Sequence, residues 1–330
     1  MEKLVKANRN YDIMLKILNL TRYYMQFTAV ITGATGKSGQ YTIERLMECM
    51  DELAGCQLRA VVRSREKAAF IAESGLPVSL CVGDIEDETF LMDAFSGADV
   101  LLHIVGIHTS RKVVPLAIRA GIKRIIVVHT TGIYSKYKSA VAEYLRIDAD
   151  ITKMCQEAGV ALSILRPTMI YGGLDDENVV KFISMMDKLP IMPVVSGARF
   201  ALQPVHRRDL GRAYADVLLS ENTIGKDYVL SGKEPITLRD MLTVIAEYLQ
   251  KPARFFSMPY WLAISGAWVL YLVSFTKVDY REKVQRLVEP RAYPHEDAAR
   301  DFGYDPVDFR EGVWSEVAAY LARKHDSARV

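Results

Sequence analysis

The sequence has few of the residues that mark a disulfide-stabilised, metal-binding or secreted protein. Its four cysteines are scattered through 330 residues and form no Cys-x-x-Cys pair, which excludes a disulfide framework or a zinc ribbon. The six histidines show no metal-ligand spacing, so no metal site is expected. The basic segment 1–26 has its apolar residues interrupted by Lys16 and Asn19, so no secretory signal is expected and a reducing cytoplasm is predicted.

Neither sign of charge dominates the chain. Lys and Arg number 42 against 40 Asp and Glu, a formal net charge of +2, and this balance argues against a nucleic-acid partner. Hydrophobic residues make up 50% and charged residues 25%, which is ordinary for a folded protein. The length suggests about two structural units at ~150 residues each, and nothing in the sequence indicates an oligomeric state.

Long apolar runs are scarce, with one exception at residues 259–275. This run, PYWLAISGAWVLYLVSF, carries no charge and spans 17 residues. That length lies at the lower end of the ~17–25 residues needed to cross a bilayer. The favoured interpretation is a buried helix, or two short pieces broken at Gly266. The alternative is a peripheral helix that lies on a membrane surface or on a partner protein.

Short apolar strands alternate with helical patterns from residue 27 onward, which predicts a parallel sheet covered by helices on both faces. This α/β pattern is that of a Rossmann-type, doubly wound domain. After Tyr171 the elements become short and proline-rich, which predicts a smaller, mostly helical C-terminal lobe. The expected strands are 27–32, 57–63, 78–82, 100–105, 124–129 and 161–166, and the expected helices are 38–50, 64–74, 89–95, 111–120 and 138–158.

Three glycines between the first strand and the first helix carry the strongest functional signal. Gly33 permits a tight turn, Gly36 lets the backbone approach a pyrophosphate, and Gly39 lets the helix pack closely on the strand. The N-terminus of the helix then offers free N–H groups to phosphate oxygens. This strand–turn–helix context makes a dinucleotide site the expected function of the loop.

The end of the second strand predicts which dinucleotide binds. Enzymes that prefer NAD place an acidic residue there to hold the ribose 2′-hydroxyl, but this chain has Arg63, with Arg65 and Lys67 close by. A guanidinium suits a 2′-phosphate, so NADP(H) is favoured over NAD(H). Asp84, after the third strand, can accept a hydrogen bond from an adenine amino group, whereas Asp87 is the better N-cap of the next helix.

These motifs together resemble the short-chain dehydrogenase/reductase superfamily, in its extended and atypical epimerase/dehydratase-like and NmrA-like branches. The quoted runs are TGATGKSG, VVRS, GDIED, ILRPTMIYGG, QPVHRRDLGRA and DFGYDP. The resemblance divides the chain into an extension (1–26), an NAD(P)-binding domain (27–170, with 204–230 returning to it) and a substrate-binding lobe (171–203 and 231–330). By resemblance, the dinucleotide contacts are Gly33, Thr35, Gly36, Lys37, Ser38, Gly39, Arg63, Asp84 and Ile85, with Pro167 on the nicotinamide side.

The resemblance also implies a catalytic Tyr with a Lys four residues later, and a Ser or Thr that orients the substrate. The ammonium lowers the pKa of the Tyr, and a spacing of four places both groups on one helix face. Tyr134 and Lys138 have this spacing, whereas Tyr144 stands nearer the position expected in the family but is followed by Asp148. Thr131 is the expected orienting group in either case.

Two functions follow from these alternatives. The first is an oxidoreductase or epimerase/dehydratase-type enzyme that uses NADP(H) on a polar small molecule, for example a nucleotide sugar. The second is an NADP(H)-binding sensor, regulator or assembly protein without turnover, because a carboxylate at position 148 would raise the pKa of Tyr144 instead of lowering it. Both functions require the glycine-rich loop.

Overall fold

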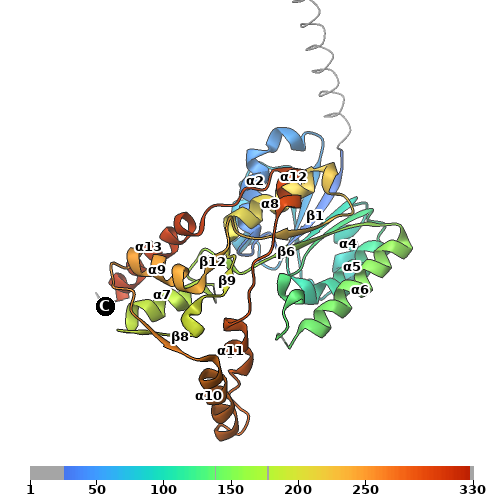
Figure 1. The fold of residues 1–330 in the computed structure, drawn as a ribbon. Helices are drawn as coiled ribbons and strands as arrows, with labels where there is room; N and C mark the ends of the chain where they lie inside the picture. The colour runs from blue at the N-terminus through green and yellow to red at the C-terminus, as the bar shows by residue number, and fades with distance from the viewer. Residues whose placement is uncertain (1–25, 138, 177, 328–330) are drawn as a thin grey trace, which may run out of the picture.

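The computed structural model describes residues 26–327 except 138 and 177. Its centre is a seven-stranded parallel sheet in the order β11-β6-β5-β4-β1-β2-β3, which confirms the predicted Rossmann-type fold (Figure 1). The strands are β1 (Thr28–Thr32), β2 (Gln57–Val62), β3 (Val78–Val82), β4 (Val100–His103), β5 (Arg124–Val128), β6 (Ala161–Pro167) and β11 (Asp227–Leu230).

Helices cover both faces of this sheet because alternate strand residues point to opposite sides. Val30 of β1 belongs to one core and Ile31 to the other. One face packs against α4 (Glu88–Phe95), α5 (Ile107–Arg119) and α6 (Val141–Ala158). The other face packs against α2 (Gly39–Glu48) and α8 (Arg207–Leu219), and the short pieces η2 (Glu66–Ala68) and α3 (Ala69–Ala72) lie beside it.

Two helices differ from their predicted bounds for local reasons. The helix expected over 64–74 is divided because Ala68 leaves the helical region, at φ −103° and ψ 7°. The helix expected from residue 111 begins at Ile107, since Gly106 turns the chain directly after β4 with a φ of +117°. A side chain other than glycine would be strained at that φ value.

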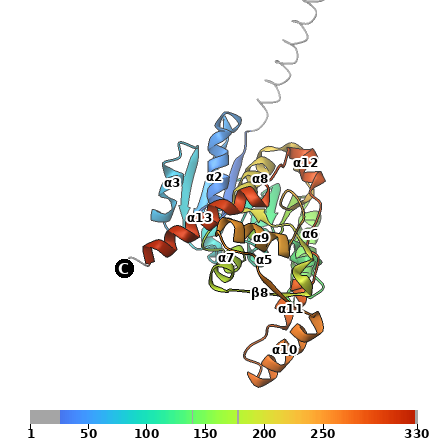
Figure 2. The ribbon, with the colours of Figure 1, turned by 60° about the vertical axis from the view of Figure 1, so that its left-hand side comes forward.

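A third core lies in the C-terminal lobe. Its apolar residues come from α7 (Val179–Lys188), α9 (Leu238–Tyr248), β8 (Met192–Val195) and α13 (Phe309–Ser327). Figure 1 shows these helices grouped to one side of the sheet, and Figure 2 shows the same group from another direction. The remaining elements are β7 (Ile170–Tyr171), β9 (Ala201–Leu202), β10 (Val205–His206), β12 (Ile236–Thr237), β13 (Phe255–Met258), α10 (Tyr260–Val273), α11 (Arg281–Leu287), α12 (Glu296–Phe302) and the turns η1 (Met50–Leu53), η3 (Thr131–Tyr134), η4 (Ser196–Ala198) and η5 (Glu221–Thr223).

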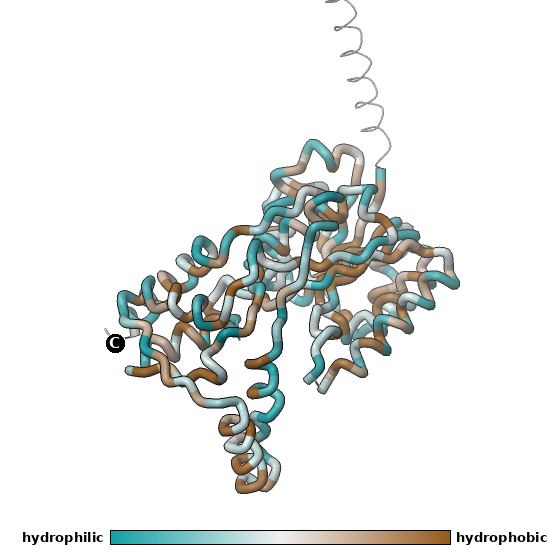
Figure 3. The backbone as a smooth tube through the Cα atoms, viewed as in Figure 1, coloured by the Kyte–Doolittle hydropathy of each residue, from teal (hydrophilic) through white to brown (hydrophobic). Residues whose placement is uncertain are grey.

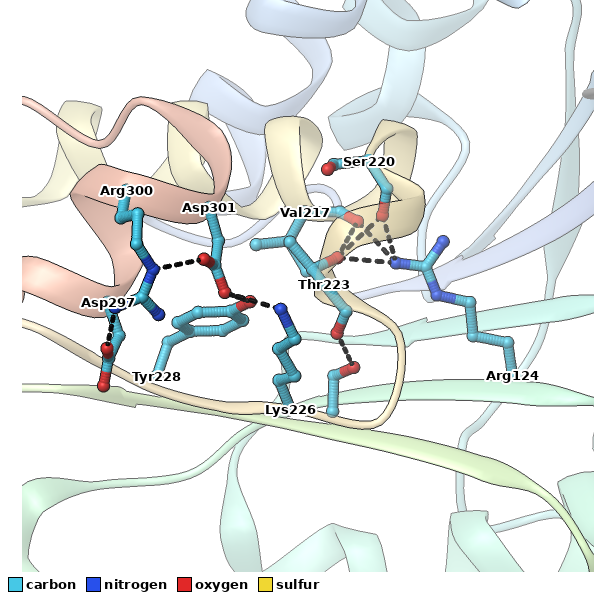
Figure 4. A network of polar contacts seen from close by, with 10 residues as sticks. Arg124, Val217, Ser220, Thr223, Lys226, Tyr228, Asp297, Arg300 and Asp301 are labelled. Atoms are coloured by element: carbon cyan, nitrogen blue, oxygen red, sulfur yellow. Dashed lines mark hydrogen bonds and ion pairs between the residues drawn. The ribbon is translucent and has the colours of Figure 1, made fainter. Parts of the chain in front are cut away.

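Polar contacts hold the last part of the chain against the edge of the sheet (Figure 4). Asp301 of α12 accepts hydrogen bonds from Lys226 and from the Tyr228 hydroxyl of β11, both at 2.8 Å. Nearby, Arg124 of β5 donates to the Val217 and Ser220 carbonyls at the end of α8. These carbonyls have no partner within their own helix, so the buried guanidinium satisfies them. The Asp301 contacts thereby hold α12 against β11 at the edge of the sheet.

The prediction that the apolar run 259–275 is buried is wrong. The run forms the single helix α10, unbroken at Gly266, but this helix is not buried: Ala267 is the one buried side chain among its residues. Among the described residues, no helix is both long enough and apolar enough to cross a membrane.

Candidate functional site: a dinucleotide cleft with an adjoining cavity

The loop between β1 and α2 is built for close approach of a ligand to the backbone. Gly33 has a φ of +85°, and its carbonyl accepts a hydrogen bond from the Gly36 N–H at 2.9 Å. A Cβ atom at Gly39 would lie 2.1 Å from the Gly33 carbonyl oxygen, so only glycine fits there. Within the described chain, no side chain caps the N-terminus of α2 at Ser38. The Gln40 N–H donates to the Gly36 carbonyl at 3.2 Å, whereas the N–H of Gly39, the first residue of α2, has no backbone partner among the described residues and is available to a phosphate oxygen.

This loop forms part of the wall of a cavity of about 730 Å³ at the carboxyl ends of the strands. Such a volume fits a dinucleotide, and the glycine cradle fits its pyrophosphate. Pro167 is not part of the wall of this cavity; its carbonyl accepts a hydrogen bond from the Thr131 hydroxyl at 3.0 Å. The other expected cofactor residues all line it: Gly33, Thr35, Gly36, Lys37, Ser38, Gly39, Arg63, Asp84 and Ile85.

The outer end of the cleft is basic. Arg63 and Lys67 both line it, and neither side chain forms an ion pair with another residue in the described part of the chain. Glu86 also lies there, but Lys112 pairs with it at 3.2 Å. Asp84 accepts a hydrogen bond from the Glu86 N–H at 2.9 Å. The charge left for a ligand at this end of the cleft is thus positive.

The chain after β7 contacts the phosphate loop through an acidic residue. Asp175 lies 3.6 Å from the Lys37 ammonium and 2.8 Å from the Arg207 guanidinium. Burial opposes the ionisation of Asp175, but Arg207 and Lys37 outweigh it and lower the pKa of the carboxyl. The C-terminal lobe is thereby connected to the phosphate loop.

A second cavity of about 290 Å³ adjoins the first, and Ile170 lines both. We call it the inner cavity. It combines hydroxyl groups from the segment after β5 with cationic and phenolic side chains from the C-terminal lobe. Its wall consists of Thr130, Thr131, Gly132, Ser135, Thr168, Met169, Ile170, Asn178, Leu202, Arg286, Arg291 and Tyr293.

The structure separates the predicted catalytic residues. Thr131 lies in the wall of the inner cavity. Tyr134 is 48% exposed, and its ring centroid lies 5.3 Å from that of Tyr293. Tyr144 is buried in α6, where its ring centroid lies 5.4 Å from that of His108. Lys138 lies outside the described residues. Neither tyrosine is among the residues that line either cavity.

Both carboxylate oxygens of Asp148, on the buried side of α6, have polar partners. One carboxylate oxygen lies 2.5 Å from the His129 ring nitrogen, and the other accepts a hydrogen bond from Arg166 at 2.5 Å. Burial opposes its ionisation, but the His129 hydrogen bond and the Arg166 charge lower its pKa below the ordinary value. The carboxylate four residues after Tyr144, where the resemblance leads us to expect a Lys, is therefore part of a buried ion pair.

Three residues of the inner cavity, Arg286, Arg291 and Tyr293, were not predicted from the sequence. The Nε atoms of Arg286 and Arg291 are buried and have no hydrogen-bond partner among the described residues. Burial lowers the pKa of Arg291 to about 10, and the charge of Arg286 adds to this shift, so Arg291 is cationic at neutral pH. Burial, followed by the Glu289 charge, raises the pKa of Tyr293, which keeps its hydroxyl protonated. No motif surrounds these residues, so only the fold could reveal them.

Comparison with known proteins agrees with this geometry. The profile of the NAD(P)H-binding family matches residues 33–220, more than half of the chain, so the protein belongs to this NAD(P)H-binding family. This membership confirms the resemblance to the atypical short-chain dehydrogenase/reductases.

Three similar proteins illustrate the relationship. The 40 kDa subunit of mitochondrial NADH-ubiquinone oxidoreductase from Neurospora crassa is 19% identical over 90% of this chain and 80% of its own length. Quinone oxidoreductase 2 of Escherichia coli is 26% identical over 64% of this chain and 71% of its own. The structure of an Escherichia coli NADPH-dependent quinone oxidoreductase complexed with NADPH superimposes with a TM-score of 0.66 at 21% identity, covering 89% of this chain and 99% of that one.

Proposed function

We propose that the protein is an NADP(H)-dependent oxidoreductase that acts on an anionic, oxygen-bearing small molecule in the inner cavity. The observation that carries this proposal is a pair of arginines beside the dinucleotide cleft, whose buried Nε atoms have no hydrogen-bond partner among the described residues. A buried donor without a partner is costly, and an anionic ligand would satisfy both. A nucleotide sugar has this chemistry, and so does any other carbonyl compound with a phosphate or carboxylate group.

The residues of the inner cavity have complementary tasks. The bound dinucleotide would supply or accept a hydride at its nicotinamide ring. Arg286 and Arg291 bind the anionic group of the substrate. The protonated hydroxyl of Tyr293 donates a hydrogen bond to the substrate oxygen, and Thr131 orients that oxygen from the opposite element. Tyr134, whose ring lies against Tyr293, keeps the phenol in place.

The first test concerns the arginines. Replacement of Arg291 by alanine should raise KM for the substrate about tenfold, the effect of losing one charge-assisted hydrogen bond, and change kcat less. NADPH oxidation is followed by absorbance against a panel of quinones, nucleotide sugars and carbonyl compounds with and without a phosphate group. Arg146→Ala, an exposed arginine of α6, is the matched control. Equal KM values for Arg291→Ala and the wild type would refute the anionic-substrate proposal.

The second test concerns the cofactor. Because Arg63 and Lys67 leave an unpaired positive charge at the outer end of the cleft, NADPH should bind more tightly than NADH. Arg63→Ala is expected to weaken NADPH binding about tenfold and to leave NADH binding unchanged. Fluorescence titration with both dinucleotides measures this difference, and Arg146→Ala again serves as the control. Equal affinities of the wild type for the two dinucleotides would contradict the NADP(H) preference.

A non-catalytic role is the second candidate, and the state of Asp148 favours it. The position at which the family's Lys is expected carries an acidic residue held by Arg166 and His129, so α6 does not offer the usual Tyr–Lys pair. A similar protein is described as a subunit of a larger oxidoreductase. Tight NADPH binding without oxidation by any acceptor of the panel would favour this structural or sensing role.

A further inference from the structure

Helices α10 and α11 form a hairpin that extends away from the rest of the molecule. Figures 1 and 2 show it from two directions, and in both views it projects beyond the sheet and the lobe. We call residues 259–287 the projecting hairpin. Figure 3 shows hydrophobic, brown positions along this projecting segment. An exposed apolar surface of this kind marks an interaction site.

The side chains of α10 are exposed on more than one face. At 3.6 residues per turn, the exposed positions from 261 to 273 cover roughly 200° of the helix circumference. A helix that packs into a protein groove needs only an apolar stripe of about 100°. Helix α10 has no charged residue and therefore no polar face. The exposed large side chains of α10 are Trp261 (66%), Leu262 (47%), Trp268 (48%), Val269 (60%), Leu270 (42%), Leu272 (65%) and Val273 (70%).

The length of α10 limits how it can meet a bilayer. Its 14 residues span roughly 21 Å at 1.5 Å per residue, which is shorter than the ~30 Å hydrocarbon core. The helix can therefore enter one leaflet without reaching the other side. The turn after α10 extends the apolar surface, because Phe275 is 85% exposed.

The polar part of the hairpin is basic. Residues 259–287 contain four Lys and Arg but only two acidic residues, and one of the acidic residues, Asp279, pairs with Arg281 at 2.8 Å. The Arg281 guanidinium lies 3.7 Å from the Tyr271 ring centroid and 4.2 Å from that of Trp268. Lys283 lies 4.7 Å from the Tyr280 ring. Aromatic rings beside cationic groups are typical of residues that lie in the headgroup region of an anionic membrane.

We propose that the projecting hairpin binds an anionic lipid membrane, with α10 inserted into one leaflet and Lys277, Arg281 and Lys283 among the headgroups. Arg286 at the end of α11 also lines the inner cavity, so this binding would place the substrate site close to the lipid surface. The proposal does not depend on the proposed function, because the apolar and basic surface exists whether or not the cavity supports turnover.

Vesicle flotation of the full chain tests the proposal. We expect the protein to float with vesicles of phosphatidylcholine and phosphatidylserine, and at least tenfold less with phosphatidylcholine alone. The double variant Leu272→Glu and Val273→Glu should lose vesicle binding, since each charge opposes insertion. Trp314→Ser, which removes an exposed tryptophan from α13, is the matched control and should float like the wild type. Unchanged NADPH binding and thermal unfolding show that each variant is folded.

Tryptophan fluorescence gives an independent readout, because the chain has three tryptophans and two of them lie on α10. Anionic vesicles should shift the emission to shorter wavelength in the Trp314→Phe variant but not in the Trp261→Phe and Trp268→Phe double variant. Failure to float with either vesicle overturns the proposal. Equal flotation with both kinds of vesicle would also overturn it. The same holds if the wild type forms a dimer in sedimentation velocity, the double glutamate variant is a monomer, and neither protein binds vesicles.

Discussion

Replacement of Gly39 by alanine should weaken NADPH binding by about a hundredfold or more, which corresponds to roughly 2.7 kcal/mol. The added Cβ would lie 2.1 Å from the Gly33 carbonyl oxygen and 2.8 Å from that of Ala34. Both atoms belong to the backbone, so the loop can accommodate the methyl group only by opening. The N–H groups at the start of α2 then no longer converge on the phosphates.

Calorimetric titration with NADPH measures this loss. Gly266→Ala is the matched control, since a Cβ atom at that position of α10 meets nothing within 4 Å. The control should bind NADPH like the wild type. Thermal unfolding of Gly39→Ala shows whether the fold persists, because the glycine also lets α2 approach β1. If the folded variant binds NADPH within about threefold of the wild type, less than 1 kcal/mol, the loop does not hold the pyrophosphate.

Replacement of Asp148 by asparagine should lower the free energy of unfolding by about 3 kcal/mol, as expected when one partner of a buried ion pair loses its charge. Arg166 is 6% exposed, and its second carboxylate partner, Asp227, is more distant, at 3.3 Å. The variant therefore leaves a buried guanidinium without adequate compensation. Urea denaturation at pH 7 measures the difference. Asp150→Asn, an exposed position on the same helix, is the control and should change stability by less than about 0.5 kcal/mol.

The stabilising contribution of Asp148 to the free energy of unfolding should decrease as the pH falls. Its pKa is lowered in the folded protein by His129 and Arg166 despite burial, so its stabilising contribution is present above the unfolded pKa. That contribution is lost as the pH falls through the lower folded value. The stability gap between wild type and Asp148→Asn should therefore narrow as the pH is lowered from 7 towards 3. A gap that widens on acidification would show that the ion pair is not its source.

The sheet and the phosphate loop could be predicted because their signals are local. Buried parallel strands appear as short runs of Val, Ile and Leu, and the glycines of the loop stand at fixed spacing between a strand and a helix. The bounds of two helices could not be predicted, since the turn at Gly106 and the break at Ala68 are set by backbone angles. These angles depend on how the chain meets its neighbours.

The apolar run 259–275 shows where sequence patterns fail. Its composition is the same for a helix buried in a core and for one that projects from the protein, and only packing distinguishes them. The lobe core is already filled by α7, α9, β8 and α13. Helix α10 is consequently left outside that core, with its tryptophans exposed.

The sequence by itself determined the class of fold, the dinucleotide loop and the basic residues beside it, because each depends on neighbours within a few positions. The tertiary structure decided what lies around the inner cavity and what Asp148 does. The inner cavity brings Thr131 together with Arg286, Arg291 and Tyr293, which follow it by more than 150 residues in the sequence. Asp148 of α6 likewise pairs with Arg166 of β6. Such contacts depend on packing between distant segments, and periodicity and spacing carry no information about them.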